Sequence, residues 1–275
     1  MSGVVVVDKP RGLTSHDVVH KVRGKNKGGH TGTLDPMATG VLPVCLGEAT
    51  KLAQLLSSDE KAYEATLTLG TSTDTLDAEG KVVATGPLVP FDAAVLAKFR
   101  GTYLQTPPMY SAVKVGGRKL YEAARAGEEL EREPREVTVT RLEVLGVEGP
   151  EVRLVVESSK GFYVRVLVAE IAKALGTEGH LSGLRRTRAG AFTLAQAVTM
   201  EEAAAGKGLM TVEAAVAHWP SVRVSETDVR KVLSGGRVEA APVAGPVCVL
   251  GPGGRLLAIA DVEGGLLKYR RVMAS

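Results

Sequence analysis

Cysteine and aromatic residues are scarce in this sequence. Its 275 residues include two cysteines, Cys45 and Cys248, which lie far apart and outside any spacing typical of metal ligands. They cannot form the disulfide framework of a small secreted protein, so we expect a reducing compartment, the cytoplasm. Aromatic residues make up 4% of the chain, so the core must consist mainly of valine, leucine, alanine and isoleucine.

Long hydrophobic runs are absent as well. No apolar stretch reaches the roughly 20 residues that a helix needs to cross a bilayer. The first residues, MSGVVVVDKP, have no basic leader and their valine run ends at Asp8, so we expect no secretory signal peptide. The length and an ordinary 44% of hydrophobic residues predict a globular protein away from membranes, with one large domain or a large domain and a small companion.

Positive charge is concentrated in two segments. The formal net charge is only +3, but residues 1–30 and residues 160–190 each carry six Lys or Arg against two Asp or Glu. Two basic segments on a nearly neutral body fit a local binding site for a polyanion such as a nucleic acid. On charge alone, an ordinary solvated surface is an equally good interpretation.

Patterns of helix and of strand are mixed along the chain, without the rhythm of a parallel βαβ fold. The motif TSHD (14–17) has the form of a capping box and predicts a helix that ends at Gly24. Strands are predicted at 4–8, 63–70, 106–115, 137–147 and 151–158, and helices near 49–56, 91–100, 118–131 and 165–176. The expected fold class is α+β, with a mixed, mainly antiparallel sheet and flanking helices.

The character of the sequence changes after Trp219 and Pro220. The remaining residues contain one short helical pattern, followed by small strands that Gly and Pro separate. We therefore expect two domains, a large one at 1–220 and a small β domain at 221–275.

The segment GHTGTLDPMATGV (29–41) is rich in glycine and threonine and predicts a shaped loop. Residues 24–31 have the spacing of a phosphate-binding loop, but His30 stands where such a loop has its lysine, and no strand directly precedes the segment. His16 and His20 are four apart on a predicted helix but lack a third ligand nearby. Neither a nucleotide site nor a metal site is therefore indicated.

Asp35, inside this loop, has two interpretations. An aspartate followed by a proline, here Pro36, is typical of a helix N-cap, and spacing alone favours this interpretation. The glycines around Asp35 instead clear space beside one carboxylate, as close approach of a ligand requires. Asp35 is therefore either a helix cap or a catalytic carboxylate.

A second group of candidates lies in SSKGFYVRVLV (158–168). Tyr163 and Arg165 would share one face if they were on a strand. An arginine beside a carboxylate keeps it ionised, as a nucleophilic aspartate requires. The simpler alternatives are a packed aromatic ring and an exposed charge at the start of a helix. LRRTRAGAF (184–192) has three arginines within five residues and fits either contact with phosphates or a solvated turn.

Six blocks of the sequence, taken together and in order, resemble the bacterial tRNA pseudouridine-55 synthase family. They are VDKPRGLTSHDVV (7–19), GHTGTLDPMATGVLPVCLGEATK (29–51), KAYEATLTLGTSTDTLDAEG (61–80), TPPMYSAVKVGGRKLYEAARAG (106–127), SSKGFYVRVLVAEIAKALG (158–176) and LRRTRAGAF (184–192). The stretch 221–275 loosely resembles the small RNA-binding PUA-type domain of this family. The connection at 23–28 is shorter than expected for the family.

The resemblance implies catalytic roles for three residues. Asp35 corresponds to the catalytic nucleophile, and Arg165 to the arginine that pairs with it. Tyr63 corresponds to the tyrosine that stacks on the target uracil and is a candidate for proton transfer.

The resemblance also implies residues that bind the substrate. Tyr163 and Leu184 would line the uracil pocket together with Tyr63. His30 would help to hold the RNA loop around the target, and Lys9 belongs to a first motif that supports the catalytic loop.

The implied reaction isomerises one uridine in the T-loop of tRNA, at position 55, to pseudouridine. It requires no cofactor and no metal, and the base must be flipped out of its stack. The expected partner is the T-arm of tRNA, with no membrane, and the protein is expected to be a monomer. The alternative is a non-catalytic tRNA-binding or chaperone protein that uses the same surfaces.

Overall fold

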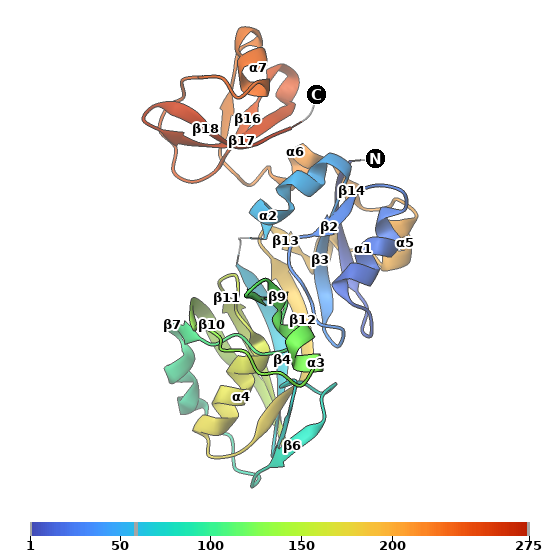
Figure 1. Cartoon of the computed structure of the whole chain (residues 1–275), viewed down its shortest axis with the longest axis vertical. Helices are drawn as coiled ribbons and strands as arrows, with labels where there is room; N and C mark the ends of the chain where they lie inside the picture. The colour runs from blue at the N-terminus through green and yellow to red at the C-terminus, as the bar shows by residue number, and fades with distance from the viewer. Residues whose placement is uncertain (1, 58–59, 274–275) are drawn as a thin grey trace.

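The computed structural model describes residues 2–57 and 60–273, and a ten-stranded sheet forms the body of the molecule (Figure 1). Eight strands follow the order β14-β1-β3-β12-β4-β11-β10-β7, while β2 pairs with β3 and β13 pairs with β12. The strands are β1 (Gly3–Lys9), β2 (Gly28–His30), β3 (Thr39–Leu46), β4 (Lys61–Leu69), β7 (Gly101–Gln105), β10 (Arg135–Glu148), β11 (Glu151–Ser158), β12 (Gly179–Ala189), β13 (Phe192–Thr193) and β14 (Leu209–Met210).

Helices cover the sheet, and two small hairpins extend from it (Figure 1). The α-helices of this body are α1 (Ser15–Arg23), α2 (Ala53–Leu56), α3 (Leu120–Arg125), α4 (Val164–Ala174), α5 (Met200–Ala204) and α6 (Val212–Ala215). The 3-10 helices are η1 (Gly47–Leu52), η2 (Ala93–Phe99) and η3 (Leu194–Gln196). The hairpins pair β5 (Thr71–Thr73) with β6 (Val82–Thr85) and β8 (Lys114–Val115) with β9 (Arg118–Lys119). The expected α+β class with a mainly antiparallel sheet is confirmed.

A short parallel contact between β12 and β3 joins the two halves of the sheet. It consists of the pairs Arg185↔Thr39 and Arg186↔Gly40, whereas the other pairings in this sheet are antiparallel. Gly40 has a φ of +100°, and a Cβ at this position would lie 2.2 Å from the Arg186 carbonyl oxygen. Only glycine allows this close approach, which sets the loop before β3 against β12.

The predicted strand of four valines is buried on both of its faces. Val5 and Val7 belong to the core that also contains residues of α1 and α5, whereas Val4 and Val6 face a second apolar cluster on the other side of β1. A strand that is buried on both faces has a continuous run of apolar residues in its sequence. For this reason β1 could be predicted from its four valines. The helix of the TSHD motif was also correctly predicted, since Thr14 and Asp17 form a capping box and Gly24 follows the last residue of α1.

The C-terminal region forms a separate four-stranded sheet with its own apolar core (Figure 1). Its elements are β15 (Ser221–Arg223), α7 (Glu226–Leu233), β16 (Val247–Leu250), η4 (Pro252–Gly254), β17 (Leu256–Glu263) and β18 (Leu266–Val272). Cys248 and Ile259 of this sheet also join the cluster that contains Val4 and Cys45, so the sheet packs on the main body. The domain boundary at residue 220 stays a prediction.

Two further observations concern expected absences. In the part of the chain that the structure describes, no helix is both long and apolar enough to span a bilayer. Cys45 and Cys248 are free thiols, each buried, on β3 and β16 respectively.

Several local predictions were wrong. Residues 106–113 form no strand, and only β8 remains of the one predicted at 106–115. The helix predicted at 118–131 is reduced to α3, and the strand β3 was not predicted. Tyr163 is not on a strand but precedes the first turn of α4. These segments are held by distant partners, which local sequence patterns do not reveal.

Candidate active site

Asp35 begins a tight turn in the loop between β2 and β3. The Ala38 N–H donates to the Asp35 carbonyl oxygen at 3.0 Å, and Pro36 takes the second position of the turn, where its fixed φ is favoured. No helix follows, so the helix-cap interpretation of Asp35 was wrong. Residues 24–31 likewise contain β2 and are not followed by a helix, which rules out a phosphate-binding loop of the helical type.

Buried polar side chains hold the loop that carries Asp35 in place through its backbone carbonyl oxygens. Lys9 is fully buried, and its Nζ donates to the carbonyl oxygens of Ala38, Pro10 and Pro36 at 2.7, 3.0 and 3.2 Å. Burial lowers the pKa of Lys9 to about 8, although nearby carboxylates, Asp35 first among them, oppose the shift. Lys9 thus holds the loop through these carbonyl oxygens and is not itself exposed to a ligand.

Arg186 holds the same loop from β12. Its side chain is only 1% exposed, and it donates through Nε, Nη2 and Nη1 to the carbonyl oxygens of Val41, Gly32 and Thr33 at 2.7, 3.1 and 3.4 Å. No carboxylate among the described residues pairs with this guanidinium. It also hydrogen-bonds Tyr63, so the loop, the tyrosine and a buried positive charge form one unit.

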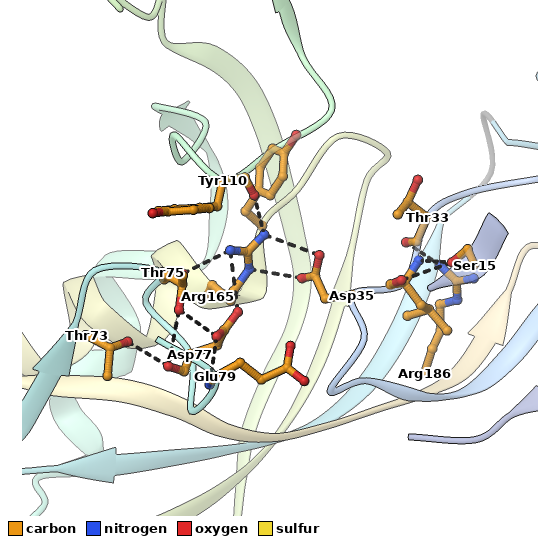
Figure 2. Close-up of polar contacts among 12 residues, drawn as sticks. Ser15, Thr33, Asp35, Thr73, Thr75, Asp77, Glu79, Tyr110, Arg165 and Arg186 are labelled. Atoms are coloured by element: carbon orange, nitrogen blue, oxygen red, sulfur yellow. Dashed lines mark hydrogen bonds and ion pairs between the residues drawn. The ribbon is translucent and has the colours of Figure 1, made fainter. Parts of the chain in front are cut away.

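Arg165, in the first turn of α4, binds Asp35 directly (Figure 2). Its Nε lies 3.0 Å from Asp35 Oδ2, and its Nη2 lies 3.4 Å from Asp35 Oδ1, a fork-like contact. The remaining N–H groups reach the carbonyl oxygens of Thr75 and Tyr110, each at 2.9 Å, and Asp77 Oδ2 at 3.5 Å. Three of these contacts are hydrogen bonds, to Thr75, Tyr110 and Asp35 Oδ1, and the other two are ion pairs; together they fix the plane of the guanidinium and hence the Asp35 carboxylate.

Asp77, which the sequence did not single out, is the second carboxylate at Arg165 (Figure 2). Its side chain is 6% exposed, and its Oδ1 accepts from Thr75 Oγ1 at 2.6 Å and from the Glu79 N–H at 3.1 Å. It looked like one of several acids in a polar turn. Its role depends on the contact with Arg165, which lies 88 residues later in the sequence. The sequence around Asp77 does not predict that contact.

Burial raises the pKa of the Asp35 carboxyl above its ordinary value, and Asp77 adds to this rise. The positive charge of Arg165 and its hydrogen bonds oppose the shift. The charge of Asp35 is thus stabilised mainly by Arg165, with a smaller contribution from Lys9, at a position where its side chain remains 33% exposed. It is the exposed member of a chain of charges whose other members, Arg165 and Asp77, are buried.

Asp35 and Arg165 lie in the wall of a cavity of about 250 Å³, together with Tyr63, Tyr163 and Leu184. The structure thus brings together five of the residues that the sequence singled out. The cavity is slightly smaller than the roughly 300–1,000 Å³ of most ligand pockets, a size that suits one planar base better than a large cofactor.

Tyr63 is almost completely buried on β4. Burial raises the pKa of its phenol, while the charge of Arg186 and the hydrogen bond to it oppose the rise. A phenol beside an unpaired guanidinium is better able to release a proton than one buried among apolar groups.

His30 lies on β2, before the loop, and is not part of the cavity wall. Its Nδ1 accepts the Gly32 N–H at 3.3 Å, which leaves Nε2 as the protonated nitrogen. Burial, Arg186 and His16 lower the pKa of His30, so the ring is neutral at pH 7. Within residues 2–57 and 60–273, no group of three His, Cys, Asp or Glu side chains could hold a metal ion.

The arginines of LRRTRAGAF do not form the exposed grip on phosphates that the sequence suggested. Arg185 pairs with Asp8 at 2.8 Å, and Arg188 pairs with Glu157. Arg186 is buried below the loop. Arg185 and Arg186 point to opposite faces of β12, and the pairing with β4 is irregular between Arg186 and Arg188, so the three side chains face different partners.

The sequence matches two profiles that together describe one family. Residues 20–164 match the N-terminal domain of the TruB family of pseudouridylate synthases, and residues 165–229 match the C-terminal domain of tRNA pseudouridylate synthase B.

Curated relatives extend this match to the whole chain. The chain is 46% identical over 294 aligned positions to tRNA pseudouridine synthase B of Stutzerimonas stutzeri, covering 100% of this chain and 96% of the relative. It is 47% identical over 290 positions to tRNA pseudouridine synthase B of Aromatoleum aromaticum, covering 100% and 94%.

Solved structures share the fold. A chain in a crystal structure of a Cbf5-Nop10-Gar1 complex superposes with a TM-score of 0.76 at 30% identity, covering 98% of this chain and 84% of that one. A chain of an H/ACA RNP bound to a substrate RNA containing 2'-deoxyuridine superposes with a TM-score of 0.75 at 27% identity, covering 99% and 85%. With these matches spanning both of its ends, the chain belongs to the TruB family of pseudouridylate synthases and is an isomerase.

Proposed function

We propose that this protein converts the uridine at position 55, in the T-loop of tRNA, to pseudouridine, with Asp35 as the nucleophile. Membership of the TruB family and the names of the curated relatives support pseudouridine formation in tRNA. The observation that carries the residue assignment is the contact between Asp35 and the buried Arg165, at the wall of a cavity of about 250 Å³.

The reaction moves one bond of the nucleotide. The N1–C1′ glycosidic bond breaks, the uracil turns, and a C5–C1′ bond forms, while C5 loses a proton and N1 gains one. Nothing is oxidised or reduced and no group enters, so the proposal requires no cofactor or metal. The uridine must first leave its stack, at a cost of a few kcal/mol that contacts with the RNA backbone and with Tyr63 would offset.

Asp35 can act in three ways on such a base: by attack at C1′, by attack at C6 of the ring, or by helping to remove the C2′ proton. Each route requires the carboxylate form. Arg165 would keep Asp35 ionised and aim it into the cavity through its two contacts of 3.0 and 3.4 Å. Tyr63, whose pKa is raised by burial although Arg186 opposes the rise, would stack on the uracil and is the candidate for the proton transfer that accompanies the loss of the C5 proton.

The other predicted residues would bind the RNA or support the site. Tyr163 and Leu184 would contact the flipped uracil as part of the cavity wall. His30, outside the wall, would contact the RNA loop through Nε2, since Nδ1 accepts the Gly32 N–H. Lys9 would contribute through the loop that it holds.

The remaining expectations belong to the same proposal. The T-arm is the part of tRNA that would enter the site, and residues 221–275 would be a small RNA-binding domain beside the large domain at 1–220. The protein would act as a monomer in the cytoplasm, where tRNA is modified.

The test uses unmodified tRNA that carries tritium at C5 of its uridines, because isomerisation releases this hydrogen to water. We expect one equivalent of tritium from the wild type and none from Asp35→Asn, while both bind the tRNA. Asp74→Asn is the matched control, since Asp74 is exposed and its contact with the Lys81 N–H suits an amide oxygen equally well. A binding or chaperone protein would release no tritium in any form, and that result would end the proposal.

A further inference from the structure

Three buried side-chain oxygens have no hydrogen-bond partner within residues 2–57 and 60–273. They are Tyr103 Oη, Ser111 Oγ and Ser158 Oγ. A buried hydroxyl without a partner destabilises the fold, so each such group calls for an explanation. Of the three, only Ser111 belongs to the wall of the cavity that contains Asp35.

The backbone of Ser111 is fixed, even though its side chain is unpaired. Its N–H donates to the Met109 carbonyl oxygen at 2.9 Å, and its carbonyl oxygen accepts the Tyr121 N–H at 3.1 Å. The carbonyl oxygen of the preceding residue, Tyr110, accepts from Arg165 Nη2 at 2.9 Å. Ser111 is therefore anchored directly beside the Asp35–Arg165 pair, with its hydroxyl left unused.

The nearest candidate partner does not satisfy this hydroxyl. Burial raises the pKa of the Tyr163 phenol, and a hydrogen-bonding contact with the Ser111 hydroxyl opposes the rise, so the two side chains lie close together. This contact falls short of full hydrogen-bond geometry, so Ser111 Oγ completes no hydrogen bond. A hydroxyl with no bond to break can turn about its single side-chain torsion at little cost.

We propose that Ser111 is a base-recognition residue whose Oγ–H donates a hydrogen bond to a carbonyl oxygen of the flipped uracil. This inference rests on the proposed function. Ser111 lies in the wall of the cavity of about 250 Å³, and its buried, unpaired hydroxyl reaches a ligand there by turning toward the cavity. A uracil ring presents two carbonyl oxygens as acceptors. The substrate thus completes the hydrogen bond that the free protein lacks. A site built in this way disfavours a base without an acceptor at that position, because the hydroxyl then stays unpaired.

The test compares Ser111→Ala with Ser158→Ala. Ser158 is the matched control because its hydroxyl is equally buried and unpaired but lies outside the cavity wall. Each variant reacts under single-turnover conditions with three T-arm RNAs that carry uridine, 2-thiouridine or 4-thiouridine at the target position. Pseudouridine or its thio analogue is measured after digestion to nucleosides.

On the uridine RNA, we expect Ser111→Ala to react about fivefold to tenfold more slowly than the wild type, the effect of one lost hydrogen bond. On one of the two thio RNAs this difference should vanish, because sulfur is a weak acceptor. Ser158→Ala should react like the wild type on each RNA. Both variants should melt no lower than the wild type and up to about 2 °C higher, since each loses an unpaired buried hydroxyl.

Two results would overturn the assignment: wild-type rates for Ser111→Ala on the uridine RNA, or an equal loss on all three RNAs. A drop in melting temperature that accounts for the slower reaction would also overturn it. Failure of the wild type to react with the uridine RNA would instead contradict the proposed function itself.

Discussion

Replacing Arg165 by alanine should abolish turnover and also destabilise the fold. The change leaves the carboxylate of Asp77, 6% exposed, without a cation, and it leaves the carbonyl oxygens of Thr75 and Tyr110 without their donor. Removing one partner of a buried ion pair costs about 3–5 kcal/mol. In a chain of this size each kcal/mol lowers the melting temperature by about 2–4 °C, so we expect a drop of roughly 10 °C.

A second substitution separates the two effects. Asp77→Asn removes the uncompensated charge, so Arg165→Ala/Asp77→Asn should recover about half of the lost unfolding free energy. Turnover should not return, because Asp35 still lacks its arginine. Asp77→Asn alone should be the mildest of the three variants, since Arg165 keeps Asp35 and both carbonyl oxygens.

The assays are urea unfolding, single-turnover pseudouridine formation and tRNA binding, performed where each variant is folded. Binding should stay close to that of the wild type, because the pair lies in the pocket and not along the RNA backbone. Wild-type turnover in Arg165→Ala, or a double variant no more stable than the single one, would refute this account of the site.

Three further predictions follow from the same geometry. The pKa of Asp35 lies above its usual 3.8, so as the pH falls, turnover should be lost at a higher pH than for an aspartate of ordinary pKa. Above that pKa the ionised carboxylate reduces the free energy of unfolding. At pH 7, Asp35→Asn should therefore unfold at the same or a higher urea concentration than the wild type. Gly40→Ala, at a φ of +100° and 2.2 Å from a carbonyl oxygen, should lose at least about 2 kcal/mol of stability and most turnover, whereas Gly29→Ala, with open space around its Cβ, should lose neither. A lysine at position 186 cannot bond the same three carbonyl oxygens at once, so the loop that carries Asp35 should be displaced. Arg186→Lys should therefore remain folded by circular dichroism but lose about 100-fold in turnover. Unchanged turnover would contradict this role of Arg186.

The elements that could be predicted from the sequence are those with strong local signals. The valine run of β1 and the capping box before α1 are visible within a few residues, and α4 has a clear apolar face. The segment 106–113 could not be predicted in this way, because its irregular path is held by contacts with Arg165 and with Tyr121.

The residues of the candidate site also fall into those that the sequence predicted and those that it did not. Asp35, Arg165 and Tyr63 were named because their blocks resemble a known family, and the structure places them in one cavity wall. Asp77 was missed, and Arg186 was predicted only as one of three arginines that could contact phosphates, since nothing near them in the sequence distinguishes a buried charge from a solvated one. Leu184, two positions before Arg186 on β12, was named, and the alternation of the strand could have drawn attention to its neighbour.

The central claim is that Asp35 makes pseudouridine at one position of tRNA. Its most direct test is to map pseudouridine, nucleotide by nucleotide, in an unmodified tRNA transcript after incubation with wild type or with Asp35→Asn. We expect complete conversion at position 55 by the wild type and none by a variant that still binds the transcript. Conversion by Asp35→Asn, or pseudouridine at another position with position 55 unmodified, would contradict the account.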